Sequence, residues 1–155
     1  MSLALDHRNS VIAKIMVQYD AESDPAILPV VSIEDFFEYN WDEHSLAPNI
    51  ADAGRPTIAE CYRILREIKQ RSSVQDVLVA IHECPEADEP EDRDIWPDSD
   101  TIYVITSASD DEVAKWTSQL KPTEIGSGWS CNTGKRPAVA PEVQDGMRVA
   151  VLWWD

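Results

Sequence analysis

Two β-rich runs joined by a charged connection constrain the fold of this chain more than any other feature. Residues 74–83 (VQDVLVAIHE) and 101–107 (TIYVITS) are rich in β-branched and aromatic residues, which is typical of strands. The connection between them shows no helical periodicity, whereas the crossover that joins parallel strands is usually a helix. We therefore expect the two runs to be antiparallel neighbours in one sheet.

The connection itself, residues 84–100, is the acidic segment of the chain. Nine carboxylates between positions 83 and 100 are balanced only by Arg93, and three prolines interrupt regular structure. The whole chain carries 29 Asp+Glu against 13 Lys+Arg, a formal net charge of -16. Such a surface repels anions and attracts cations or a basic protein. It also argues against nucleic acid as a partner, because affinity for phosphates comes mainly from Lys and Arg.

Three helices are predicted from capping residues that precede apolar side chains at helical spacing. The sequences TIAE at 57–60 and SDDE at 109–112 are capping boxes, each followed by an apolar stripe. Pro122 closes the second of these helices. Ser32 caps a shorter helix over 33–39. The chain therefore places helical segments on both sides of the paired strands in sequence.

Two further runs complete the expected sheet. Residues 11–19 (VIAKIMVQY) and 147–154 (MRVAVLWW) are predicted strands on composition. The strong elements then follow the order of a ferredoxin-like βαββαβ unit, with an insertion after the first strand. We expect an α+β fold of two layers, with a largely antiparallel sheet and helices on one face. The chain is predicted to be a single globular domain over 1–155, with a loop-rich segment at 122–146.

A polar loop, residues 38–49, follows the short helix and is the candidate chemical site. It gathers the side chains of Glu38, Asn40, Asp42, Glu43, His44 and Asn49. A loop of this composition can hold a metal ion or place a general base beside a substrate. The alternative is that Asn40 takes the left-handed conformation that ends a helix, while the acids are simply solvated. We expect no bound metal and no cofactor, since the sequence lacks paired zinc-ligand motifs, a nucleophile elbow and glycine-rich phosphate loops.

The cysteines and the hydropathy pattern indicate a compartment. Cys61, Cys84 and Cys131 are an odd number without a CxxC pair, which fits a reducing environment. No apolar run approaches the ~20 residues that span a bilayer, and the first residues lack the apolar stretch of a secretion signal. We expect a cytoplasmic protein that does not bind membranes.

The acidic segment also supplies the candidate partner-binding residues, which are Glu89, Glu91, Asp92, Asp94, Trp96 and Asp98. Trp96 would provide an aromatic anchor within a field that steers a basic partner. Like Trp41 and Trp129, it lies in a loop, where a tryptophan either is exposed or fixes the loop. The favoured interpretation is a non-enzymatic protein-binding domain for a basic protein surface, with immunity-like toxin neutralisation as its most specific form. The alternatives are a small enzyme or metal-binding protein that uses the polar loop, and an acidic housekeeping domain whose charge serves solubility.

Three stretches of the sequence together resemble a family of uncharacterised bacterial proteins. They are VVSIEDFFEYNWDEHSLAPN (30–49), WPDSDTIYVITSASDDEV (96–113) and LWWD (152–155). The resemblance covers most of the chain and departs before Asn40, where Tyr39 replaces a family-like glycine. It implies a single compact cytosolic bacterial domain, and it implies no activity, cofactor or catalytic residue.

Overall fold

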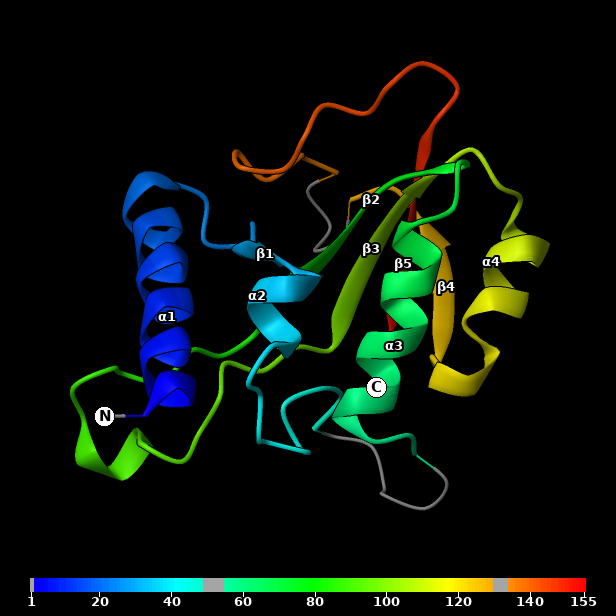
Figure 1. Cartoon of the computed structure of the whole chain (residues 1–155). Helices are drawn as coiled ribbons and strands as arrows, with labels where there is room; N and C mark the ends of the chain where they lie inside the picture. Colours follow the sequence, from blue (N-terminus) through cyan, green and yellow to red (C-terminus); the bar gives the residue numbers. More distant parts are fainter. Residues whose placement is uncertain (1, 49–54, 130–133) are drawn as a thin grey trace.

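The computed structural model describes residues 2–48, 55–129 and 134–155, which build a five-stranded sheet and its helices (Figure 1). In chain order the elements are α1 (Leu3–Ala21), β1 (Val30–Ser32), α2 (Ile33–Phe37), α3 (Ile58–Lys69), β2 (Val74–Ala80), β3 (Thr101–Thr106), α4 (Asp110–Trp116), β4 (Glu124–Ser127) and β5 (Arg148–Trp153), with short 3₁₀ helices at Pro90–Asp92 and Ser118–Leu120. This is the α+β fold that the sequence predicts.

The strands are ordered β1-β2-β3-β5-β4, and every neighbouring pair is antiparallel. β2 and β3 pair along their length, from Val74 opposite Thr106 to Ala80 opposite Thr101. The antiparallel pairing predicted for the two β-rich runs is therefore confirmed. The predicted strand near the carboxyl end is also confirmed, because β5 pairs with β3 on its other side.

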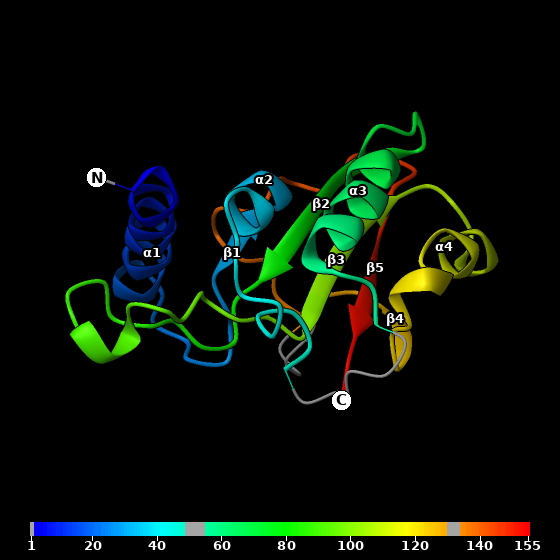
Figure 2. The ribbon, with the colours of Figure 1, turned by 60° about the horizontal axis from the view of Figure 1, so that its bottom comes forward.

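Side chains alternate between the two faces of the sheet, and different parts of the chain cover each face. Val77, Val104 and Leu152 point into the main core, together with buried residues from all four α-helices. Tyr103 and Ile105 point to the other face, which is covered by loop residues rather than by a helix. Figures 1 and 2 show α2, α3 and α4 over the first face, with α1 standing beside the β1 edge. The predicted placement of helices on one face is confirmed.

The three predicted helices begin at their caps. The side chains of Ser32, Thr57 and Ser109 each accept a hydrogen bond from the backbone N–H three residues on, at 3.0, 3.1 and 3.2 Å. α2 ends at Phe37, earlier than predicted, and Tyr39 then takes a left-handed φ of 61°. The residue in the left-handed conformation is therefore Tyr39 and not Asn40.

The predicted strand over 11–19 is wrong, because these residues belong to helix α1. Ser2 caps this helix by accepting a hydrogen bond from the Leu5 N–H at 3.2 Å. The buried side chains fall at helical spacing, and they are Arg8, Val11, Ile12 and Ile15. Packing of this stripe against the core outweighs the modest preference of β-branched residues for strands.

The ferredoxin-like order is wrong for the same reason. That arrangement needs a strand over 11–19 between the strands at 101–107 and 147–154, whereas these residues are helical and β3 pairs directly with β5. Its edges are β1 and β4, which have only 3 and 4 residues. β4 lies within 122–146, so the segment that the sequence predicts to be mostly loop supplies one edge of the sheet.

At the β1 edge of the sheet, opposite β4, the Gln18 side chain of α1 pairs with the strand backbone. The Gln18 Nε2–H donates to the Val30 carbonyl at 2.8 Å, and Gln18 Oε1 accepts from the Val30 N–H at 2.8 Å. This pairing imitates a neighbouring strand and removes β1 as a free edge. It also fixes α1 in position beside the sheet. Among the described residues, no helix is long and apolar enough to cross a membrane.

Candidate functional site

A buried arginine ties the acidic segment to α1. Arg8 is fully buried, and its guanidinium donates to the carbonyls of Ile95 at 2.8 Å and Asp92 at 2.5 Å, and to Asn9 Oδ1 at 2.9 Å. Burial lowers the pKa of Arg8, while the nearby Asp92 and Cys84 oppose this effect. In Figure 1 the acidic segment lies beneath the N-terminal half of α1 (green, lower left). These bonds hold the backbone of the acidic segment in one conformation, although the charges of its side chains repel one another.

The polar loop and the acidic segment lie against each other, although the sequence presents them as separate candidates. The Ser99 N–H donates to the Ser45 carbonyl at 2.8 Å, and the Ala47 N–H donates to the Ser99 carbonyl at 2.7 Å. The indole N–H of Trp41 donates to the Asp94 carbonyl at 3.1 Å. These contacts join loops that are some fifty residues apart, and no periodicity in the sequence signals such a contact.

Two acids of the polar loop hold backbone groups in place. Asp42 accepts hydrogen bonds from the His44 N–H at 3.0 Å and from the Trp96 N–H at 3.3 Å. Glu43 accepts from the N–H of Ile58, the first residue of α3, at 3.0 Å. Both carboxylates are therefore occupied in fixing the loop against its neighbours.

The other described members of the polar loop, Glu38, Asn40 and His44, are spread over different neighbours. Asn40 donates to the Phe36 carbonyl at 3.1 Å, and Glu38 accepts from the Tyr62 hydroxyl at 3.3 Å. His44 is exposed, and Asn49 lies outside the described residues. Within the described ranges, no group of three or more His, Cys, Asp or Glu side chains could hold a metal ion. The arrangement is that of a loop whose polar groups stabilise its own conformation.

The carboxylates of the acidic segment lie mainly at the surface. Glu89, Glu91 and Asp94 are exposed, and Asp92 and Asp98 are half-buried. Asp92 also accepts a hydrogen bond from the backbone N–H of residue 86 at 2.9 Å, which closes the segment on itself. The predicted binding acids therefore form a dense negative surface on an ordered backbone.

Trp96 is not available as an exposed anchor, because its side chain is 0% exposed. Its ring meets that of Trp41 edge-on at 5.1 Å and stacks near His7 at 6.0 Å. Trp96 therefore fixes the loops, as Trp129 does against Tyr103. Of the loop tryptophans Trp41, Trp96 and Trp129, Trp41 is the exposed one beside the acids, and the sequence alone could not distinguish it from the other two.

The half-buried carboxyl group of Asp98 has a raised pKa. Burial raises its pKa to about 6, and the carboxylates of Glu83 and Asp100 add to this rise. The Glu83 N–H, which donates to Asp98 at 3.1 Å, and the nearby His82 oppose it. At neutral pH Asp98 thus carries a poorly solvated negative charge, and a cation placed beside it would be favoured.

A groove, here called the acidic groove, separates α1 from the first half of the acidic segment. Its main part has a volume of about 590 Å³. The lining residues are Asn9, Ile12, Ala13, Met16 and Tyr19 from α1, and 84–88 from the acidic segment. It continues into a hollow of about 260 Å³ beside Glu89 and Arg93. The α1 wall is mostly apolar, and the opposite wall carries carboxylates.

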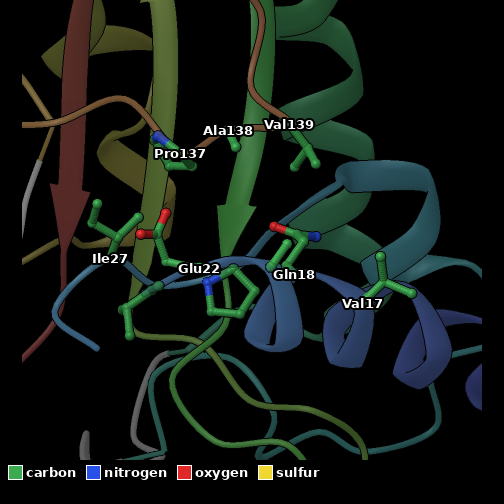
Figure 3. A pocket seen from close by; sticks show the side chains of 10 residues that line it. Val17, Gln18, Glu22, Ile27, Pro137, Ala138 and Val139 are labelled. Carbon is green, nitrogen blue, oxygen red and sulfur yellow. The ribbon is translucent and has the colours of Figure 1, made fainter. Parts of the chain in front are cut away.

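A smaller pocket of about 70 Å³ lies on another side of α1. Figure 3 shows Val17 and Gln18 of α1 facing Pro137, Ala138 and Val139 of the loop that covers the sheet. Its walls are apolar apart from Gln18 and Glu22, and Gln18 is already bonded to β1. The pocket therefore belongs to the packing of α1 against the sheet edge.

Comparison with known proteins gives a family for the chain. The curated protein "Uncharacterized protein YfbO" of Escherichia coli (strain K12) is 33% identical over 142 residues, which cover 91% of this chain and 93% of that protein. No solved structure matches the chain significantly. Residues 6–152 match the family described as the Uncharacterized protein YfbO family. The predicted resemblance to a family of uncharacterised bacterial proteins is confirmed, and since this match spans nearly the whole sequence, the chain belongs to the YfbO family.

Proposed function

We propose that this protein is a non-enzymatic, cytoplasmic binding protein whose acidic segment holds a basic protein partner, without nucleic acid, membrane or cofactor. Immunity-like neutralisation of a toxin is the most specific form of this function. One observation carries the proposal: buried Arg8 bonds two backbone carbonyls of the acidic segment, while Glu89, Glu91 and Asp94 stay exposed. The negative surface is thus ordered before any partner arrives.

An ordered charged surface favours association in two ways. The negative field raises the rate at which a positively charged partner encounters the correct face. A fixed backbone lowers the entropy that is lost when the complex forms. Trp41 and Ile95, which are 39% and 46% exposed, add apolar area beside the charges and are the side chains expected to anchor the interface.

The alternative of a small enzyme or metal-binding protein has less support. Asp42 and Glu43, the acids that such a site would recruit from the polar loop, already accept backbone hydrogen bonds. The third possibility, a housekeeping domain whose charge serves only solubility, differs from the proposal in one respect: it assigns no special importance to where the charges lie.

Capture from cell lysate with two charge-matched variants tests the proposal. The first variant, Glu89→Gln/Glu91→Gln/Asp94→Asn, removes three exposed charges from the acidic segment. The control, Glu124→Gln/Glu142→Gln/Asp145→Asn, removes three exposed charges elsewhere on the chain. Captured proteins are identified and quantified by mass spectrometry.

We expect the wild-type protein and the control to enrich the same basic protein, and the acidic-segment variant to lose most of it. Equal recovery with all three proteins would contradict the proposal. Equal loss with both variants would show that capture depends on net charge without regard to position, which contradicts a binding role specific to the acidic segment.

A further inference from the structure

The acidic groove combines an apolar wall with a charged one. On α1, Ile12 is buried at its base, while Met16 and Tyr19 are 45% and 41% exposed. The facing wall carries the exposed carboxylates of Glu86 and Asp88. An occupant that fits both walls must present apolar side chains on one side and cations on the other.

The ends of the groove extend this charge pattern. Burial is the main cause that raises the pKa of Tyr19, and the nearby Cys84, Asp98 and Glu83 raise this pKa further. These three groups therefore lie close to the Tyr19 end of the groove. The exposed Glu89 lies in the hollow at the other end. A second copy of this chain, at a net charge of -16, and an anionic membrane would both be repelled from such a surface.

The backbone of the two walls offers an incoming chain few hydrogen bonds. On one wall the backbone groups are those of helix α1, which are bonded within the helix along its length. On the other wall the N–H groups of residues 86, 89 and 93 are already bonded within the acidic segment. The free sheet edge, β4, is at the opposite end of the sheet from β1 and α1. An extended peptide would leave its own polar groups unpaired in this groove, whereas a helix satisfies them internally.

Resting on the proposed function, we infer that the part of the partner held here is a positively charged amphipathic α-helix that lies along α1 in the acidic groove. The groove is lined from Leu5 to Tyr19 of α1, which corresponds to about 21 Å at the rise of an α-helix. A bound helix of about 14 residues, or four turns, matches this length. Its apolar face meets Met16 and Tyr19, and its Lys or Arg side chains meet the carboxylates.

Two synthetic peptides of identical composition test this inference. Each contains seven Leu and seven Lys, ordered as LKKLLKKLLKKLLK to form an amphipathic helix or as LKLKLKLKLKLKLK to alternate as a strand does. Each peptide carries a fluorophore, and its affinity is measured by fluorescence anisotropy. The proteins compared are the wild type, the acidic-segment variant described above, Met16→Glu and Val17→Glu.

The two single substitutions add the same charge to adjacent residues of α1. Met16 lines the acidic groove, whereas Val17 is 66% exposed and lines the other pocket. We expect the helical peptide to bind the wild type at least ~10-fold more tightly than the alternating one, and Met16→Glu to weaken it by about tenfold through lost apolar contact. Val17→Glu should bind as well as the wild type or slightly better.

Equal affinity for the two peptides, or equal effects of Met16→Glu and Val17→Glu, would overturn the inference. If peptide binding were nevertheless weaker in the acidic-segment variant and weaker with added salt, the proposed function would stand while the inference of a bound helix would not. Binding that is indifferent to that variant and to salt would contradict the proposed function itself. Thermal unfolding of each variant establishes that it is folded, and Tyr19→Ser serves as a second groove variant.

Discussion

Replacing Arg8 with methionine is expected to release the acidic segment from α1. The guanidinium donates to the carbonyls of Asp92 and Ile95, and bonds from a charged donor contribute ~1.5–3 kcal/mol each. Two such bonds amount to ~3–6 kcal/mol, from which the cost of burying the charge must be subtracted. Methionine fills much of the same volume and introduces no charge. We therefore expect the free energy of unfolding to fall by about 2–3 kcal/mol.

Denaturant unfolding and amide hydrogen exchange measure the two parts of this prediction. Exchange should become faster in 84–100 and stay unchanged in β2 and β3, because the change loosens a loop while leaving the sheet intact. Arg63→Met is the control: Arg63 forms an exposed ion pair with Glu67 at 3.3 Å, so this substitution should cost less than ~0.5 kcal/mol. A loss below ~1 kcal/mol for Arg8→Met, with unchanged exchange in the acidic segment, would refute the role given to Arg8.

Three other predictions concern single residues. Because the folded-state pKa of Asp98 is raised to about 6, the folded protein binds this proton more tightly than the unfolded chain, so stability should rise as pH falls from about 7 toward 4. Asp98→Asn should raise the free energy of unfolding at pH 7 by on the order of 1 kcal/mol, a figure reduced because Asp98 is partly exposed. The substitution should also flatten the pH dependence of stability in denaturant titrations, and an unchanged pH profile would contradict this prediction. Tyr39→Gly should be more stable than Tyr39→Ala by about 1 kcal/mol, because both lose the ring contact with His7 while only glycine relieves the left-handed φ of 61°, and equal midpoints of unfolding would count against this strain. Protein purified without chelator should contain no stoichiometric metal by elemental analysis; a transition metal or calcium ion that is lost on Asp42→Ala would revive the metal-binding alternative.

Local signals in the sequence predict the centre of the fold well. The two β-rich runs and the capping residues Ser32, Thr57 and Ser109 identify β2, β3 and three of the helices, because caps and strand composition act over a few residues. The same reasoning fails for α1, whose β-branched residues indicate a strand. Only its packing beside β1, through Gln18 and a buried stripe, decides in favour of a helix.

The candidate site depends more heavily on contacts between distant residues. Composition identifies the acidic segment and the polar loop, but their union through Ser45 and Ser99 is a property of the folded chain. The same holds for the burial of Trp96, which has no neighbouring pattern to signal it. Tyr39 is an exception: the family-like glycine expected before Asn40 marks the position that takes the left-handed conformation.

The association rate of the captured basic partner, measured against salt concentration, tests the central claim most directly. The wild-type protein and the control variant Glu124→Gln/Glu142→Gln/Asp145→Asn should associate fast at low salt and several-fold more slowly as salt rises past 0.1 M, where the screening length is ~10 Å. The acidic-segment variant should associate more slowly at low salt and depend less on salt, while its thermal stability stays close to that of the wild type, since exposed charges in this loop contribute little to folding. An undiminished rate for the acidic-segment variant, with no dependence on salt in any of the three proteins, would contradict a binding role for the acidic segment.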